Sequence, residues 1–253
     1  MTFHKKLVLV LLMACFPTAI LASTADQLRI AAEEGKVAFV LVTAPGAVGV
    51  EQAKEIIHGA MKQVEKSLIA ELDRSDEANA ALVAKYGLSG APVPLILVFA
   101  SNGAIAGGNL SSKLTSQQLT EMIPSPKKAE VLQVLQSGHA VLLTASRDGM
   151  NSKSDVKACC AAACSQMTNK CQAVEINMDD KAEADFLKQL KVNSLSAEPV
   201  TVVINAQGQV TGSFNGPVDV GSLVQAANKK VSSGCCPPGS GKTCPPPATK
   251  KGP

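Results

Sequence analysis

Cysteine is the most reactive residue type in this sequence of 253 residues, which contains eight cysteines. Seven of them form two groups, one in the second half of the chain and one near its C-terminus: Cys159, Cys160, Cys164 and Cys171, and Cys235, Cys236 and Cys244. Cysteine thiolates bind soft metal ions such as Cu(I) and Zn(II), and they also attack disulfides. The two groups therefore predict a thiol cluster that holds a soft metal ion or exchanges thiols.

The spacing of the first group predicts a row of sulfur atoms along a helix. Four sulfur-bearing residues follow one another at intervals of four, three and four positions: Cys160, Cys164, Met167 and Cys171. A continuous helix would place all four side chains on one face. The alternative is ordinary core packing, because cysteine also behaves as a small hydrophobic residue and Val156 continues the same row. The sequence leaves both interpretations open.

The start of this helix is predicted by Ser152 and Asp155, whose spacing fits a capping box. Cys159 and Cys160 would then lie about two turns inside the helix, where the helix dipole no longer stabilises a thiolate. A disulfide between these neighbouring cysteines is not expected, because it would distort the helical peptide that joins them. They should therefore pair with other cysteines or act as thiolates.

The second group lies in a tail, residues 232–253, that is rich in Pro, Gly, Ser and Lys. Such a segment cannot bury a core and is expected to be flexible unless it is tied down. The predicted final helix stops about four residues before Cys235. Four residues in an extended chain span at most about 14 Å. We therefore expect Cys235 and Cys236 to approach Cys164 and Cys171, where they could form disulfides or share a metal ion. The alternative is a solvated tail whose cysteines pair with other molecules.

The composition excludes several other kinds of site. The formal net charge is +3 and aromatic residues make up 3% of the chain. A surface that follows phosphates needs more concentrated basic residues, and base stacking needs aromatic rings, so no nucleic-acid partner is expected. The sequence has no haem-attachment motif and no mixed Cys/His zinc spacing. No catalytic residue is predicted.

The N-terminal segment, residues 1–25, has the layout of a signal peptide. Lys5 and Lys6 precede an apolar run at residues 7–13, and small residues near positions 22–25 offer a cleavage site. We therefore expect an extracytoplasmic protein, periplasmic or secreted, whose partners are other extracytoplasmic proteins.

The same segment raises the question of a membrane anchor. Its apolar run is shorter than the roughly 20 residues that cross a bilayer, so no transmembrane span is expected in the mature chain. A lipid anchor on Cys15 is an alternative, because Leu12-Met13-Ala14-Cys15 resembles a lipobox.

The rest of the chain repeats one order of predicted elements. The first repeat reads helix 25–34, strand 38–43, helix 50–64, strand 68–72, helix 76–86, strand 95–99, a hairpin turn at Asn102-Gly103 and helix 116–122. In the second repeat, strands are expected at 140–144, 173–177 and 200–204, with helices between and after them. A period of about 105 residues indicates two whole domains. Their predicted bounds are 26–123 and 129–231, with a linker at 124–128.

The segment from Tyr86-Gly87-Leu88 through Val93-Pro94 to Asn102-Gly103 resembles the second half of a thioredoxin, and the resemblance covers nearly all of residues 26–231. It implies an α/β fold class, with two tandem thioredoxin-like domains, each a mixed sheet with helices on both faces. It also implies a cis peptide bond before Pro94 and before Pro199, the prolines that precede the third strand of each repeat.

One departure from the thioredoxin pattern concerns the redox site itself. That family carries Cys-x-x-Cys between the first strand and the following helix. The corresponding residues here are Ala44 to Ala47 in the first domain and about Ala145 to Gly149 in the second, and no cysteine occurs in either segment. The resemblance therefore does not imply the usual dithiol activity.

Three functions follow from these patterns. The first is a thiol-cluster protein that binds a soft metal ion or exchanges thiols. The second is a redox-inert binding or structural scaffold, in which the cysteines pack in the core or form disulfides. The third is an atypical thiol-disulfide oxidoreductase that uses Cys160 and Cys164, or the pair Cys235 and Cys236.

Overall fold

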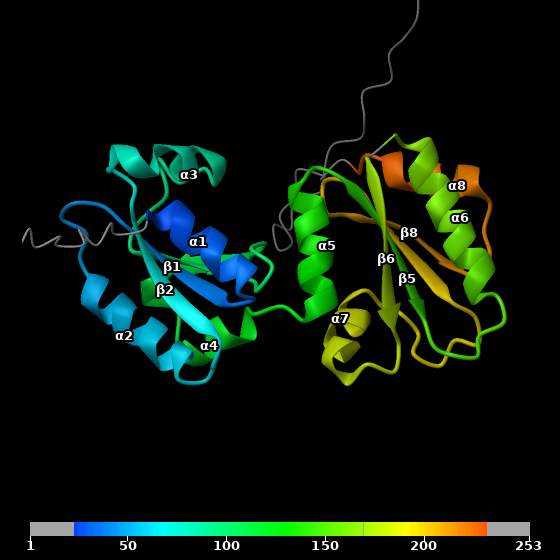
Figure 1. The fold of residues 1–253 in the computed structure, drawn as a ribbon, viewed down its shortest axis with the longest axis horizontal. Helices are drawn as coiled ribbons and strands as arrows, with labels where there is room; N and C mark the ends of the chain where they lie inside the picture. Colours follow the sequence, from blue (N-terminus) through cyan, green and yellow to red (C-terminus); the bar gives the residue numbers. More distant parts are fainter. Residues whose placement is uncertain (1–22, 169, 232–253) are drawn as a thin grey trace, which may run out of the picture.

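The structure, a computed structural model, describes residues 23–168 and 170–231. Within these residues the strands form two four-stranded sheets, one in each of two domains (Figure 1). Residues 1–22 of the predicted signal peptide lie outside the described residues, as do the proposed lipid site Cys15 and the tail cysteines Cys235, Cys236 and Cys244.

The first domain follows the order of elements predicted from the sequence. Its elements are α1 (Thr24–Glu33), β1 (Val37–Thr43), α2 (Val50–Met61), β2 (Ser67–Asp73), the 3-10 helix η1 (Glu77–Asn79), α3 (Ala80–Lys85), β3 (Leu95–Phe99), β4 (Ile105–Leu110), η2 (Ser111–Lys113) and α4 (Ser116–Glu121). Local sequence explains where the first helix begins, because the Ser23 side chain accepts a hydrogen bond from the backbone N–H of Asp26. β1 is a continuous apolar run because helices cover both faces of this central strand.

The second domain repeats this order. Its elements are α5 (Pro126–Gln136), β5 (Ala140–Ser146), α6 (Lys153–Gln166), β6 (Cys171–Asn177), η3 (Lys181–Glu183), α7 (Ala184–Gln189), β7 (Val200–Ile204), β8 (Val210–Asn215) and α8 (Val220–Asn228). Pro126 is the first residue of α5, a position that suits proline because the first helical N–H has no partner within the helix. The helix therefore begins inside residues 124–128, which the sequence predicted as a linker.

Both sheets have the same topology. The strand order is β2-β1-β3-β4 in the first sheet and β6-β5-β7-β8 in the second. β1 is parallel to β2 and antiparallel to β3, and β5 has the same relation to β6 and β7. Each sheet is therefore mixed. In the first domain, the C-terminal end of β1 lies where α2 begins. In the second domain, the C-terminal end of β5 lies where α6 begins.

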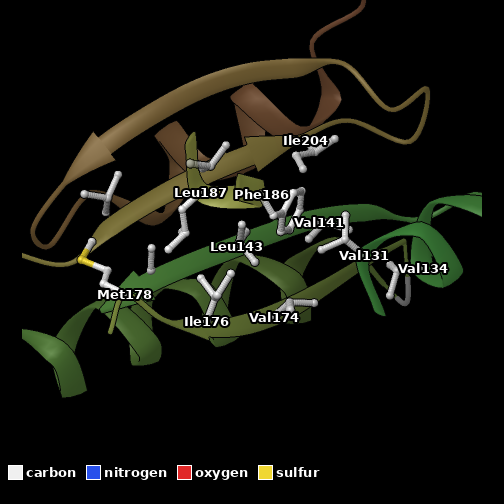
Figure 2. Packing of buried hydrophobic residues seen from close by; sticks show 13 residues of the cluster. Val131, Val134, Val141, Leu143, Val174, Ile176, Met178, Phe186, Leu187 and Ile204 are labelled. Carbon is white, nitrogen blue, oxygen red and sulfur yellow. The ribbon is translucent and has the colours of Figure 1, made fainter. Parts of the chain in front are cut away.

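Helices pack on both faces of each sheet, so each domain has two hydrophobic clusters. In the second domain, one cluster lies between the sheet and the pair α5 and α7. Figure 2 shows this cluster, in which Val131 and Val134 of α5 and Phe186 of α7 pack with Leu143 of β5. The other cluster lies between the sheet and the pair α6 and α8. Burying one such side chain stabilises the fold by about 1.5 to 3 kcal/mol.

The two domains contact each other through amide side chains on α5. Gln136 binds both backbone groups of Ile105, because its Nε2 donates to the Ile105 carbonyl at 2.7 Å and its Oε1 accepts from the Ile105 N–H at 3.0 Å. Gln133 donates to the carbonyl of Asn102 at 3.1 Å, and the Asn102 side chain donates to the carbonyl of Ala129 at 2.9 Å. These bonds tie the β3–β4 turn of the first domain to the first helix of the second.

A buried carboxylate fixes the start of the same helix. Glu183, which is 1% exposed, accepts hydrogen bonds from the Ser125 hydroxyl at 2.5 Å and from the backbone N–H of Lys127 at 2.8 Å. An acceptor at a helix N-terminus satisfies N–H groups that have no partner within the helix. Glu183 therefore anchors α5 to the rest of the second domain. The side chains of α5 in turn make the contacts to the first domain.

Candidate functional site

Cys164 and Cys171 form a disulfide in the second domain, with their Cα atoms 4.9 Å apart. Cys164 lies in the last turn of α6, whereas Cys171 is the first residue of β6. The prediction that Cys171 continues a helical row of sulfur atoms is therefore wrong. We call this end of the second domain, where α6 ends and β6 begins, the cysteine pole.

Backbone geometry explains why the helix stops before Cys171. Thr168 has a φ of 48°, in the left-handed region, and the N–H of Lys170 bonds to the carbonyl of Met167. A left-handed residue just after the last helical turn reverses the chain. Cys171 then pairs with Ala140 as the first residue pair between β6 and β5. The reversal brings its sulfur back to Cys164.

The predicted capping box at the start of α6 is also wrong. Ser152 is the residue before the helix, but its side chain makes no capping hydrogen bond to the backbone. The Ser152 hydroxyl instead donates to the carboxylate of Glu198, which lies in the loop before β7. Ser152 therefore contacts a residue distant in sequence and makes no capping bond to its own helix.

Cys160 lies in the core and is 1% exposed. Its sulfur is 3.4 Å from the Thr144 hydroxyl and 3.8 Å from the Thr201 hydroxyl. The two threonines are paired directly across β5 and β7. A hydroxyl can donate to the sulfur or accept from the S–H, so all three polar groups are satisfied without water.

The first domain has apolar residues in the equivalent places. Leu41 is the fifth residue of β1 as Thr144 is of β5, and Ile57 is the eighth residue of α2 as Cys160 is of α6. Ile96 completes the set as the second residue of β3. All three are 0% exposed. This group of three polar residues, Cys160, Thr144 and Thr201, is therefore specific to the second domain. Sequence analysis did not identify Thr144 and Thr201, because their contact with Cys160 depends on the tertiary structure.

Cys159 differs from its neighbour in exposure. It is partly exposed, and along residues 23–168 and 170–231 the free cysteines are Cys159 and Cys160. The structure therefore separates the four cysteines of the first group. It joins Cys164 to Cys171, buries Cys160 among hydroxyl groups and leaves Cys159 partly accessible.

Metal binding by this group alone is not supported. In the part of the chain that the structure describes, no three side chains of His, Cys, Asp or Glu lie together in a way that could hold a metal ion. The tail cysteines that the sequence predicted as further ligands, Cys235, Cys236 and Cys244, lie outside the described residues. The predicted approach of that tail to the cysteine pole also lies outside the described residues.

The junction between β1 and α2 is a short uncharged loop, residues 44–49. Gly46 and Gly49 both have positive φ values, 77° and 88°, which lets the chain turn sharply into the helix. Val48 lies between them and is 89% exposed. This loop presents an apolar side chain and no thiol.

The junction between β5 and α6 is held by charged groups. Arg147 forms an ion pair with Asp179 at 3.2 Å and also donates to the carbonyl of Ser194. Lys153 lies 2.9 Å from Asp148, and its hydrogen bond holds the pKa of that carboxyl below its usual value. These contacts connect three loops at the end of the domain opposite the cysteine pole.

The two candidate prolines differ. The Val93–Pro94 bond is cis, as predicted, whereas Pro199 is not preceded by a cis bond, so that prediction is wrong. Trans is the more stable form of an X-Pro bond by about 0.5 to 1 kcal/mol. Just before Pro199, the Ser196 hydroxyl donates to the carbonyl of Glu198 at 2.7 Å and accepts from its N–H at 3.3 Å.

The described chain consists of two tandem thioredoxin-like domains, each with the element order β-α-β-α-β-β-α after an initial helix. No protein-family model matches the chain, and no curated protein matches its sequence.

Similar solved structures include human ERp44, which is 11% identical with a TM-score of 0.35 over 80% of this chain and 54% of that one. The first two thioredoxin domains of Saccharomyces cerevisiae Eps1p are 9% identical, with a TM-score of 0.31 over 82% of this chain and 96% of that one. A thiol:disulfide interchange protein of the thioredoxin family from Chlorobium tepidum TLS is 13% identical, with a TM-score of 0.26 over 38% of this chain and 81% of that one. The chain spans about half the length of ERp44.

Proposed function

We propose that the protein acts by thiol-disulfide exchange at the Cys164–Cys171 disulfide. The observation that carries this proposal is the exposure of the disulfide, because both cysteines are partly exposed while Cys160 is buried. A thiolate must approach a disulfide sulfur directly to attack it. The partial exposure of both cysteines at the cysteine pole supports such an approach.

The position of the disulfide also suits a bond that opens and closes. It joins the end of a helix to the start of an edge strand, two cysteines that are seven residues apart in sequence. Helix ends and short loops open locally at a lower cost than core elements. The pairing of β6 with β5 runs from Cys171 to Asn177, so most of its residue pairs lie beyond the one at the disulfide. Reduction would therefore loosen one loop and leave the sheet intact.

The proposal is tested with the oxidised full chain and reduced glutathione. Cysteines freed at each time are alkylated and identified by peptide mapping. We expect Cys164 and Cys171 to become reduced in the folded protein at millimolar glutathione, and we expect Cys159→Ser to leave that rate unchanged. A disulfide that opens only when the protein is unfolded would contradict the proposal and identify the bond as a structural one.

We also propose that the protein works in an oxidising, extracytoplasmic compartment. A disulfide is stable in such compartments and rare where thiols are kept reduced. The layout of Lys5, Lys6 and the apolar run that follows supports export. Among the helices of residues 23–231 that are described, none has the length and apolar character needed to cross a membrane. Mass spectrometry of the native protein tests cleavage near positions 22–25.

A further inference from the structure

We infer that the cysteine pole, when its disulfide is reduced, is a binding site for Cu(I) with Cys164, Cys171 and Met167 as ligands. The inference goes beyond the proposed exchange reaction, because it gives the reduced form of the protein a ligand. It rests on the proposed function in one respect, since exchange with a thiol is what would open the disulfide in the folded chain. Three features of the second domain support it: the packing of its sulfur-bearing side chains, the turn that joins the two cysteines, and the type of ligands present.

The first feature is that one hydrophobic cluster contains the sulfur-bearing side chains of α6 and of the start of β6. Met167 is 8% exposed and belongs to the buried part of this cluster. Cys164 and Cys171 pack against the cluster and are partly exposed. An ion would therefore approach the two cysteines from solvent and meet the thioether on the side of the core.

The second feature is the turn that joins the two cysteines. Met167 follows Cys164 by three positions, and its backbone N–H bonds to the carbonyls of Ala163 and Cys164 at 3.2 and 3.1 Å, so the helical winding continues to this residue. Residues three apart are neighbours on the surface of a helix. The chain then turns back, and the Cα atom of Cys171 lies 4.9 Å from that of Cys164. The three side chains therefore belong to one short turn.

The same backbone geometry suits a metal ion between the two sulfurs. A ligand sulfur lies about 2.3 Å from a metal such as Zn(II), so two sulfurs on one ion are at most about 4.6 Å apart. With the Cα atoms of Cys164 and Cys171 4.9 Å apart, rotation of the side chains about their Cα–Cβ bonds allows that separation. The carbonyl groups at the C-terminal end of a helix, here α6, also favour a positive charge nearby.

The third feature is the type of ligands, which distinguishes Cu(I) from Zn(II). In the described residues no three side chains of His, Cys, Asp or Glu lie together in a way that could hold a metal ion, so the cysteine pair has no third ligand of these types. Structural Zn(II) sites are almost always four-coordinate, with ligands from this set. The Cys160 sulfur, in the same cluster, lies beside the hydroxyls of Thr144 and Thr201. The remaining soft donor is the thioether of Met167, and thiolates with a thioether select Cu(I).

The disulfide controls whether the site exists. In the oxidised protein the two sulfurs bond to each other, so neither is a thiolate. Two molecules of a monothiol such as glutathione reduce the bond: they become one disulfide, and the two electrons and two protons that they lose produce the thiols of Cys164 and Cys171. Each thiol releases its proton when it binds Cu(I), and the oxidation state of the ion does not change. Copper is therefore excluded from the oxidised protein and bound by the reduced one.

The test uses the full chain with Cys235, Cys236 and Cys244 replaced by Ser, so that the tail supplies no thiol. One sample is oxidised, and the other is reduced with tris(2-carboxyethyl)phosphine, which is then removed. Both are titrated under nitrogen with the Cu(I) complex of bathocuproine disulfonate, whose absorbance reports the copper that the protein removes. We expect the reduced chain to remove about one equivalent of Cu(I) more than the oxidised chain, and X-ray absorption to show about three sulfur neighbours around the copper.

Met167→Leu tests the thioether, because the change conserves the volume of the side chain and removes its sulfur. Met178→Leu is the matched control, since Met178 is also 8% exposed but packs in the cluster on the other face of the sheet. Loss of an outer-shell partner of a metal costs about 10- to 100-fold in affinity, so we expect loss of a ligand in Met167→Leu to cost at least about tenfold. Met178→Leu should bind Cu(I) like the parent chain.

Equal removal of Cu(I) by the oxidised and reduced chains, or equal affinities of the two methionine variants, would overturn the inference. Reduction by glutathione tests the proposed function separately. A disulfide that glutathione does not open in the folded protein would contradict thiol exchange, whereas Cu(I) binding by the chemically reduced chain would still support the copper site.

Discussion

The sulfur of Cys160 lies 3.4 Å from the hydroxyl of Thr144 in the core of the second domain. The equivalent positions in the first domain are apolar, Ile57 and Leu41, and both are fully buried in one hydrophobic cluster. The second domain therefore keeps a buried thiol within reach of hydroxyl groups, and its cysteines differ in burial, pairing and expected reactivity.

Replacing Cys160 by Ala should destabilise the protein. The change leaves a small cavity and removes the sulfur from two buried hydroxyl groups, so we expect the free energy of unfolding to fall by about 1 to 2 kcal/mol. Cys159→Ala is the control, because this partly exposed side chain should change stability by less than about 0.5 kcal/mol. Urea unfolding followed by circular dichroism measures both. Equal effects would contradict the burial of Cys160.

The two free thiols should also differ in reaction rate. Cys159 is partly exposed, whereas Cys160 reacts only when α6 opens locally. We expect iodoacetamide to label Cys159 in the folded protein about a hundredfold faster than Cys160, a ratio set by the cost of that opening. Quenched labelling with peptide mapping gives both rates. In urea, where the helix is unfolded, the difference should disappear.

Removing the disulfide should lower the stability of the second domain. For a loop of this length, the entropy lost by the unfolded chain predicts a decrease of about 2.5 kcal/mol in the double variant Cys164→Ser, Cys171→Ser. Hydrogen exchange of the two domains shows where the effect falls. We expect faster exchange in α6 and β6 and no change in β1 or β3. Loss of protection in the first domain as well would contradict this assignment.

The amide contacts between the domains should fix their relative orientation. Gln133→Ala with Gln136→Ala removes the hydrogen bonds to Asn102 and Ile105, so we expect a wider distribution of interdomain distances in small-angle scattering. Each domain should keep its stability within about 0.5 kcal/mol, because these side chains lie at the surface of their own domain. Gln117→Ala is the control, since Gln117 bonds only within α4, to Glu121. An unchanged scattering profile in the double variant would show that other contacts set the orientation.

Glu183→Ala should destabilise the start of α5. The change leaves the Ser125 hydroxyl and the Lys127 N–H without their acceptor, which costs about 1 to 3 kcal/mol for buried groups. Glu55→Ala, on the exposed side of α2, provides a comparison that should stay within about 0.5 kcal/mol. Thermal unfolding measures both variants. A neutral result for Glu183→Ala would mean that water replaces the carboxylate.

The sequence by itself determined the architecture. Continuous apolar runs such as 95–99 could be recognised as central strands because a strand buried on both faces has no polar position, and β3 has these bounds. The repeat at about 105 residues indicated two domains of one fold, because elements in the same order bury the same faces. The resemblance to thioredoxins implied the cis bond at Pro94, which is present, but the same implication failed at Pro199.

Only the tertiary structure decided how the cysteines are used. Spacing placed Cys171 on the helix, but a left-handed residue at Thr168 ends the helix and strand pairing with Ala140 returns Cys171 to Cys164. The partners of Cys160 come from two strands that are distant in sequence, so no local pattern could reveal them. Helical periodicity describes one segment at a time, whereas a disulfide depends on where two segments meet.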